Sequence, residues 1–85
     1  MEIRPTALFF RDYEQLPRRI QASLDKKLVC LAENLRHPSL RAKKMEGYEN
    51  VWEARITRGY RFTFSKDESG YFIRRAGSHD ILRRP

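Results

Sequence analysis

The chain has few of the residues and segments that form disulfides, zinc sites or membrane-spanning helices. Its 85 residues include one cysteine, Cys30, which excludes an intramolecular disulfide and a cysteine-based zinc site. No apolar run approaches the roughly 20 residues that a membrane-spanning helix needs. No basic segment followed by an apolar one opens the chain, so we expect no secretion by a signal peptide and a cytosolic location.

Glycine and proline are also scarce, with four of each, and they lie at the boundaries of the predicted elements. There are no repeats, linkers or low-complexity stretches. Hydrophobic residues make up 40% of the chain and aromatic ones 12%, which is enough for one modest core and too much for a disordered tail. The length and composition therefore predict a single domain over residues 1–85.

Positive charge is abundant and unevenly distributed. The formal net charge is +7. Six basic and five acidic residues precede Arg36, whereas twelve basic and six acidic residues follow from there on. This asymmetry indicates a scaffold joined to a surface that faces a polyanion. Solubility of a small basic domain, or docking to an acidic protein, would produce the same asymmetry.

The first half of the chain predicts a short strand followed by two helices. Met1–Arg4 can form an edge strand, and Thr6 is of a residue type that caps helix N-termini. Pro17 separates the helices, because proline ends one and suits the first position of the next, and His37-Pro38 ends the second. Apolar residues follow with the spacing of a buried helix face: Phe9, Tyr13, Leu16, Ile20, Leu24, Leu28, Leu31 and Leu35.

The second half predicts an antiparallel meander of three strands at residues 51–56, 60–64 and 71–76, which are rich in aromatic and β-branched side chains. A two-residue loop between the first two strands would set Ile56 opposite Arg61 and mix the faces. A three-residue loop, with Gly59 in the left-handed conformation, keeps apolar side chains together. It predicts three pairs: Trp52–Phe64, Ala54–Phe62 and Ile56–Tyr60.

The predicted fold is α+β, with two N-terminal helices packed on one face of a small antiparallel sheet and the other face open. An even-numbered turn at residues 67–70 sets Phe64 opposite Ile73, which again places apolar side chains together. The same register decides which polar side chains share the second face.

The register gathers arginines on that second face. Arg55 lies opposite Arg61, and Thr63 lies across from both Glu53 and Arg74. Like charges directly opposite each other destabilise a sheet, by a few tenths of a kcal/mol. An anion between the guanidiniums would relieve the repulsion, and arginine suits bidentate contacts with phosphate. The pattern fits a phosphate site and also fits a solvated face of long polar side chains.

Further basic residues precede the meander. Arg41, Lys43 and Lys44 form a cluster that is either ordinary surface charge or an extension of a groove that binds a nucleic-acid backbone.

Groups able to transfer protons are few. Glu46 and Glu53 are candidates for a general base or for ion-pair partners, and His79 can serve as a general acid or base near neutral pH. The two histidines are far apart in the sequence and no carboxylate cluster is present, so we expect no metal site.

With these residues in place, the chain resembles the RelE/ParE toxin superfamily, and within it the RelE-like branch. The resemblance covers nearly the whole length. It lies in the order and spacing of five segments: Asn34–Pro38, Lys44–Gly47, Val51–Ile56, Gly59–Phe62 and Gly77–Asp80. It implies the RelE-like fold and the toxin role of a type II toxin–antitoxin system.

RelE-like toxins enter the ribosomal A site and cut mRNA without a metal or other cofactor. By position, Arg61 matches the family's phosphate-contacting arginine, and Arg55 falls where a functional basic residue lies. His79 falls where a C-terminal basic or histidine group is found, and Glu46 lies near the glutamate base of some relatives. The resemblance thus implies Arg61, Arg55, His79 and Glu46 as catalytic residues.

The resemblance also implies an RNA-binding surface and a protein partner. Lys43 and Lys44 match a basic approach loop, which Arg41 and Arg74 extend. The expected partners are an acidic antitoxin, the ribosome and mRNA, with no membrane.

Two departures bear on the activity. Glu53 stands where the best-studied branch has lysine, and the tyrosine that many relatives carry near the C-terminus is absent. Proton transfer then falls to His79, with Glu46 or Glu53 as its partner. The alternatives are a ParE-like inhibitor that binds a protein without cleaving RNA, and a relative that binds an antitoxin and has lost cleavage.

Overall fold

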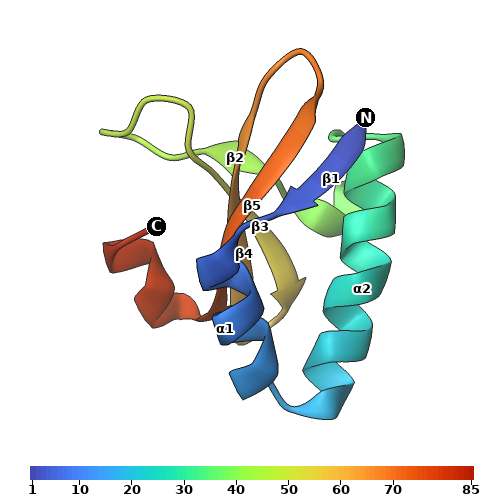
Figure 1. Ribbon diagram of the computed structural model, residues 1–85, viewed down its shortest axis with the longest axis vertical. Helices are drawn as coiled ribbons and strands as arrows, with labels where there is room; N and C mark the ends of the chain where they lie inside the picture. Colours follow the sequence, from blue (N-terminus) through green and yellow to red (C-terminus); the bar gives the residue numbers. More distant parts are fainter.

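The computed structural model describes residues 1–85, and five strands form a single sheet in the order β1-β5-β4-β3-β2 (Figure 1). The strand β1 runs parallel to β5, and the other neighbours are antiparallel. The elements in chain order are β1 (Glu2–Pro5), α1 (Ala7–Gln15), α2 (Arg18–Glu33), the 3-10 helix η1 (Pro38–Leu40), β2 (Lys43–Lys44), β3 (Trp52–Thr57), β4 (Tyr60–Lys66), β5 (Gly70–Ser78) and the 3-10 helix η2 (His79–Arg83). The predicted α+β class is confirmed.

The two helices form largely as the apolar spacing predicts. The Thr6 hydroxyl caps α1 by accepting a hydrogen bond from the Phe9 amide at 3.2 Å. Pro17 is the residue before α2, where its missing N–H costs no helical hydrogen bond. The second helix ends at Glu33, earlier than predicted, so Leu35 lies beyond it and still packs against the core.

The core lies between the helices and one face of the sheet. Phe62 and Phe64 of β4 are fully buried there. They belong to one buried apolar cluster with Phe9, Leu16, Ile20, Leu24, Leu31, Leu40, Ala54, Ile56, Tyr71, Ile73 and Ala76. This burial fixes which way every second residue of β3 and β4 points, because side chains alternate across a strand.

The β3–β4 hairpin combines the two registers that the sequence allows. Ala54 pairs with Phe62 and Arg55 with Arg61, as the three-residue loop predicts. The register then shifts by one residue at Ile56, and Thr57 pairs with Tyr60, so the predicted Ile56–Tyr60 pair is wrong. The turn itself has two residues, and Gly59 has no positive φ. A bulge lets Ile56 stay in the core while the hairpin closes tightly.

A second bulge corrects the β4–β5 register. Phe64 pairs with Ile73 as predicted, but Thr63 pairs with Arg75, which leaves Arg74 as the extra residue. Two residues of β5 therefore oppose one residue of β4. Both arginines make contacts on the face that carries Thr63, described below.

The second face of the sheet is not fully open. The C-terminal segment lies across it, on the side opposite α2 (Figure 1). Ile81 of η2 and Pro85 are buried there, and the buried Thr63 hydroxyl donates a hydrogen bond of 3.3 Å to the Pro85 oxygen. The prediction of an open face fails because the last residues carry apolar side chains that cover its centre.

Candidate functional site

A pocket of about 210 Å³ lies on the second face of the sheet, at the β3 side. Four basic residues and one acidic residue supply its polar lining: Arg41, Lys43, Arg55, Arg61 and Glu53. Four of these five were singled out in the sequence as site residues, and Glu53 was weighed as a general base. The fold thus brings together residues from three separate parts of the chain.

Strand pairing explains why these side chains meet. Lys43 pairs with Glu53 across β2 and β3, and Arg55 pairs with Arg61 across β3 and β4. Paired residues project to the same face, and Glu53 and Arg55 are two positions apart on one strand. The core on the far side of the sheet therefore holds these side chains on the pocket side.

Arg41 enters the pocket from a strained backbone. Its φ of 47° lies in the left-handed region, which is unfavourable for residues with a Cβ. It follows η1, whose Leu40 is anchored in the core. Strain of this kind persists only where the surrounding structure holds it, and it is concentrated at functional sites.

The pocket is strongly positive. Partial burial and the nearby charges of Arg41, Arg61 and Arg58 lower the pKa of Arg55 from its ordinary value. Neither of the ion pairs in the protein, Arg4–Glu2 and Arg75–Asp12, involves a pocket residue. Glu53 lines the pocket without lying within ion-pair distance of a cation. The arrangement can accept an anion that neutralises several guanidiniums at once.

Arg61 has a second, structural task. Its Nη1 donates hydrogen bonds to the main-chain oxygens of Thr57, Arg58 and Tyr60, at 2.9, 3.2 and 3.0 Å. Arg61 therefore ties down the β3–β4 turn with one end of its guanidinium. Arg55 makes no side-chain hydrogen bond, so its guanidinium has no structural role of this kind.

The remaining predicted site residues do not line this pocket. Lys44 pairs with Trp52, a core-side residue, and is exposed. Glu46 is exposed in the loop between β2 and β3. His79 is exposed at the start of η2, two residues after Gly77, the β5 partner of Arg61. Of these three residues, His79 is the one that follows closely after a strand partner of a pocket residue.

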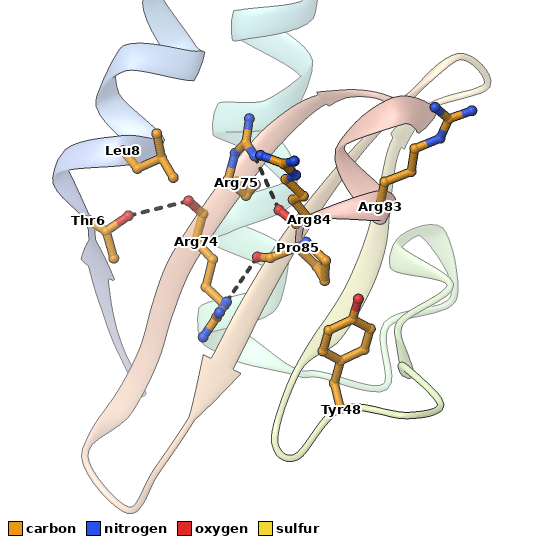
Figure 2. A pocket seen from close by; sticks show the side chains of 8 residues that line it. All are labelled: Thr6, Leu8, Tyr48, Arg74, Arg75, Arg83, Arg84 and Pro85. Carbon is orange, nitrogen blue, oxygen red and sulfur yellow. Dashed lines mark hydrogen bonds between the residues drawn. The ribbon is translucent and has the colours of Figure 1, made fainter.

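Arg74 lies on the same face as Arg55 and Arg61, as predicted, but it lines a different pocket. Its guanidinium donates from Nε to the Pro85 oxygen at 3.0 Å and from Nη1 to the Ser65 hydroxyl at 3.1 Å. Pro85 lies between Arg74 and the Tyr48 side chain, as Figure 2 shows. The C-terminal segment thus separates Arg74 from Arg55 and Arg61.

This second pocket is larger, about 610 Å³, and sequence reasoning missed it. Its lining includes four arginines and no acidic residue: Arg74, Arg75, Arg83 and Arg84, with Tyr48, Thr6, Leu8 and Pro85. The two pairs of consecutive arginines were the available signal. The β5 bulge and the C-terminal turn, which bring the pairs together, leave no mark in the apolar pattern.

Arg75 is the one arginine of the second pocket with an acidic partner. Its Nε donates to Asp12 of α1 at 2.7 Å and its Nη2 at 3.3 Å. The hydrogen bond that Arg75 donates to Asp12 raises the pKa of Arg75 above its ordinary value. The same carboxylate accepts from the Ala76 amide at 3.0 Å, so Arg75 and Asp12 join α1 to β5.

No group of three or more His, Cys, Asp or Glu side chains is arranged to hold a metal ion. None of the helices combines the length and the apolar character that crossing a membrane requires.

No family model and no curated relative matches the sequence. Solved structures do match over nearly the full length of both chains. A RelB–RelE antitoxin–toxin complex from Methanococcus jannaschii matches with a TM-score of 0.79 at 18% identity, covering 94% of each chain. The YoeB dimer from Staphylococcus aureus has a TM-score of 0.78 at 17% identity, covering 93% of this chain and 97% of that one.

The E. coli DinJ–YafQ complex matches with a TM-score of 0.79 at 14% identity, covering 95% of this chain and 96% of that one. These identities are low, and the shared feature is the arrangement of two helices on a small sheet. The chain therefore has the RelE-like fold, the one adopted by the RelE, YoeB and YafQ toxins.

Proposed function

We propose that this protein is the toxin of a type II toxin–antitoxin system and cleaves mRNA on the ribosome. The pocket of Arg41, Lys43, Arg55 and Arg61 carries the proposal, because it concentrates cations without ion-pair partners on one sheet face. The RelE-like fold supports the toxin role, since its solved examples include toxins.

The proposed reaction is an attack of a ribose 2′-oxygen on the neighbouring phosphorus. The O2′–P bond forms and the P–O5′ bond breaks, which leaves a 2′,3′-cyclic phosphate and a free 5′-hydroxyl. Negative charge grows on the phosphoryl oxygens in the transition state, and Arg55 and Arg61 stabilise it. These guanidiniums fill the charge-stabilising role, so the proposed step needs no metal or other cofactor. Lys43 and Arg41 hold the adjoining backbone.

Two protons must move in this reaction. Glu53 is the carboxylate that lines the pocket, and it accepts the proton of the 2′-hydroxyl. His79, which follows the strand partner of Arg61, supplies the proton for the leaving 5′-oxygen. Glu46 takes no part in this scheme, because Glu53, which lines the pocket, already fills the role of the base. Lys44, next to Lys43 on β2, adds to RNA attraction.

An acidic antitoxin is the proposed protein partner. The chain carries a net charge of +7, which favours association with an acidic segment. Solved structures of the same fold include complexes with the antitoxins RelB, DinJ and YefM. An acidic segment that folds on binding could cover the cationic pocket.

Growth of cells after induced expression tests the function. The wild type should arrest growth, and Arg55→Ala should relieve the arrest, because removing one phosphate-directed donor costs about 10²–10³ in rate. Arg55 is a better test residue than Arg61, because removing the Arg61 side chain also removes its hydrogen bonds to the β3–β4 turn. Arg18→Ala, an exposed arginine at the start of α2, is the matched control and should remain toxic.

Primer extension on mRNA from the same cells separates the alternatives. Discrete in-frame breaks support the nuclease. A DNA-damage response without breaks would instead assign the protein to ParE-like inhibitors. An equally toxic Arg55→Ala variant would contradict the proposed pocket.

A further inference from the structure

The second arginine pocket, formed by Arg74, Arg75, Arg83, Arg84 and Tyr48, has no role in the reaction described above (Figure 2). Its arginines differ in how far other groups already bind them. Arg75 is neutralised by Asp12, and Arg74 bonds to the Ser65 hydroxyl and to an oxygen of Pro85. The side chains of Arg83 and Arg84 are exposed, and neither takes part in an ion pair or a hydrogen bond.

Both pockets open on the same face of the sheet. Arg61, Thr63 and Ser65 alternate along β4 and so project to that face together. Arg61 lines the first pocket, Thr63 bonds to Pro85, and Ser65 bonds to the guanidinium of Arg74. Four residues at about 3.3 Å each place Arg61 and Ser65 about 13 Å apart along the strand.

Tyr48 adds an aromatic ring to the second pocket. It is 43% exposed, and its hydroxyl points toward Pro85, as Figure 2 shows. Proteins that bind single-stranded nucleic acids combine exposed aromatic rings with unpaired cations. The bases stack on the rings, and the phosphates bind the cations. Arginine also contacts phosphate through two nitrogens at once.

We propose that the Arg74–Arg83–Arg84 pocket is a second RNA subsite, which holds backbone phosphates of the same strand and stacks one base on Tyr48. The inference rests on the proposed function, because it assumes that the first pocket holds a phosphate of RNA. One strand running along β4 reaches both pockets and passes the Pro85 segment between them. This continuity favours RNA over an acidic protein segment, which would need no second pocket on the same face.

Fluorescence anisotropy with a labelled 12-nucleotide RNA tests the subsite without a ribosome. The RNA carries 2′-O-methyl groups, so that no 2′-hydroxyl is available for cleavage. The test protein is the double variant Arg83→Gln/Arg84→Gln. The matched control is Arg18→Gln/Arg19→Gln, which removes two consecutive exposed arginines from the start of α2.

Each phosphate contact contributes about 0.7 to the slope of log affinity against log salt for single strands. The Arg83/Arg84 variant should therefore lower the magnitude of the slope by up to about 1.4, and the control should keep the wild-type slope. Tyr48→Ala should weaken binding about 5- to 150-fold, whereas Tyr48→Phe should bind as the wild type does.

Two outcomes would overturn the subsite alone. The first is an Arg83/Arg84 variant whose slope equals that of the control while the wild type binds RNA. The second is an Arg83/Arg84 variant that no longer binds a poly-glutamate peptide but binds RNA as the wild type does. That result would assign the pocket to an acidic protein segment. A wild type that binds no RNA at all would also overturn the subsite, whereas the proposed function, which requires the ribosome, is tested separately by primer extension on mRNA from cells.

Discussion

Arg41 contributes a cation to the first pocket from a backbone conformation that its own Cβ disfavours. A left-handed residue with a side chain carries a cost of about 1–2 kcal/mol, which glycine largely avoids. Asn50, the other non-glycine residue with a positive φ, is of a type that tolerates this region and bonds to the main chain of Lys66. Arg41 has no such local compensation, which fits a residue kept for its charge.

Two substitutions at Arg41 should separate strain from charge. Arg41→Gly removes both, and Arg41→Ala removes the charge while the strain stays. We expect Arg41→Gly to be more stable than Arg41→Ala by about 1 kcal/mol in urea unfolding, with the same loss of RNA affinity in both. Equal stabilities would show that the positive φ carries no cost here.

At the scale of the elements, the edge strand β1 depends on a close backbone approach. A Cβ on Gly70 would overlap the main-chain oxygen of Glu2, its parallel partner across β1 and β5. Backbone atoms cannot move aside as the end of a side chain can. Glycine is therefore required at this position by the neighbouring strand, not by an unusual φ.

Gly70→Ala should lower the free energy of unfolding by about 1–3 kcal/mol, because β1 must shift away from β5. Gly59→Ala is the matched control, since a Cβ there meets nothing within 4 Å. Its stability should change by less than about 0.5–1 kcal/mol. Urea unfolding followed by circular dichroism measures both, and a Gly70→Ala variant as stable as the control would contradict the account.

The sequence predicted most of the elements, because apolar spacing reports burial directly. The Arg55–Arg61 pair followed from the alternation of side chains along the strands and is confirmed. The alternation of side chains could not predict the two bulges, at Ile56 and Arg74, because each bulge shifts the register by one residue and leaves the core intact. The first changed only the turn, whereas the second moved Arg74 into the other pocket.

The candidate site was predictable to the same extent. Arg55 and Arg61 came together as strand pairing predicts, whereas Lys43, expected in a loop, reaches the pocket through the short strand β2, with Arg41 beside it. The positions of Glu46 and His79 depend on a loop and on a 3-10 turn, which no hydrophobic period specifies. The cover formed by Ile81 and Pro85 depends on contacts between the C-terminal residues and the sheet.

At the scale of the whole molecule, the chain divides its charge between two layers. The helical half is nearly neutral, and the excess positive charge lies in the half that forms β2 to β5 and the C-terminal segment. The helices therefore support the sheet, and the far face carries both arginine pockets. This asymmetry would orient the protein as it approaches a polyanion, with an association rate that falls as salt is added.

The most direct test of the account is cleavage in a reconstituted translation reaction. Ribosomes are stalled on a defined mRNA with an empty A site, the protein is added, and primer extension locates any cut. We expect a cut within the A-site codon that requires the ribosome, slowed about 10²–10³-fold in Arg55→Ala and unchanged in Arg18→Ala. Intact mRNA with the wild type, or equal cleavage by Arg55→Ala, would contradict it.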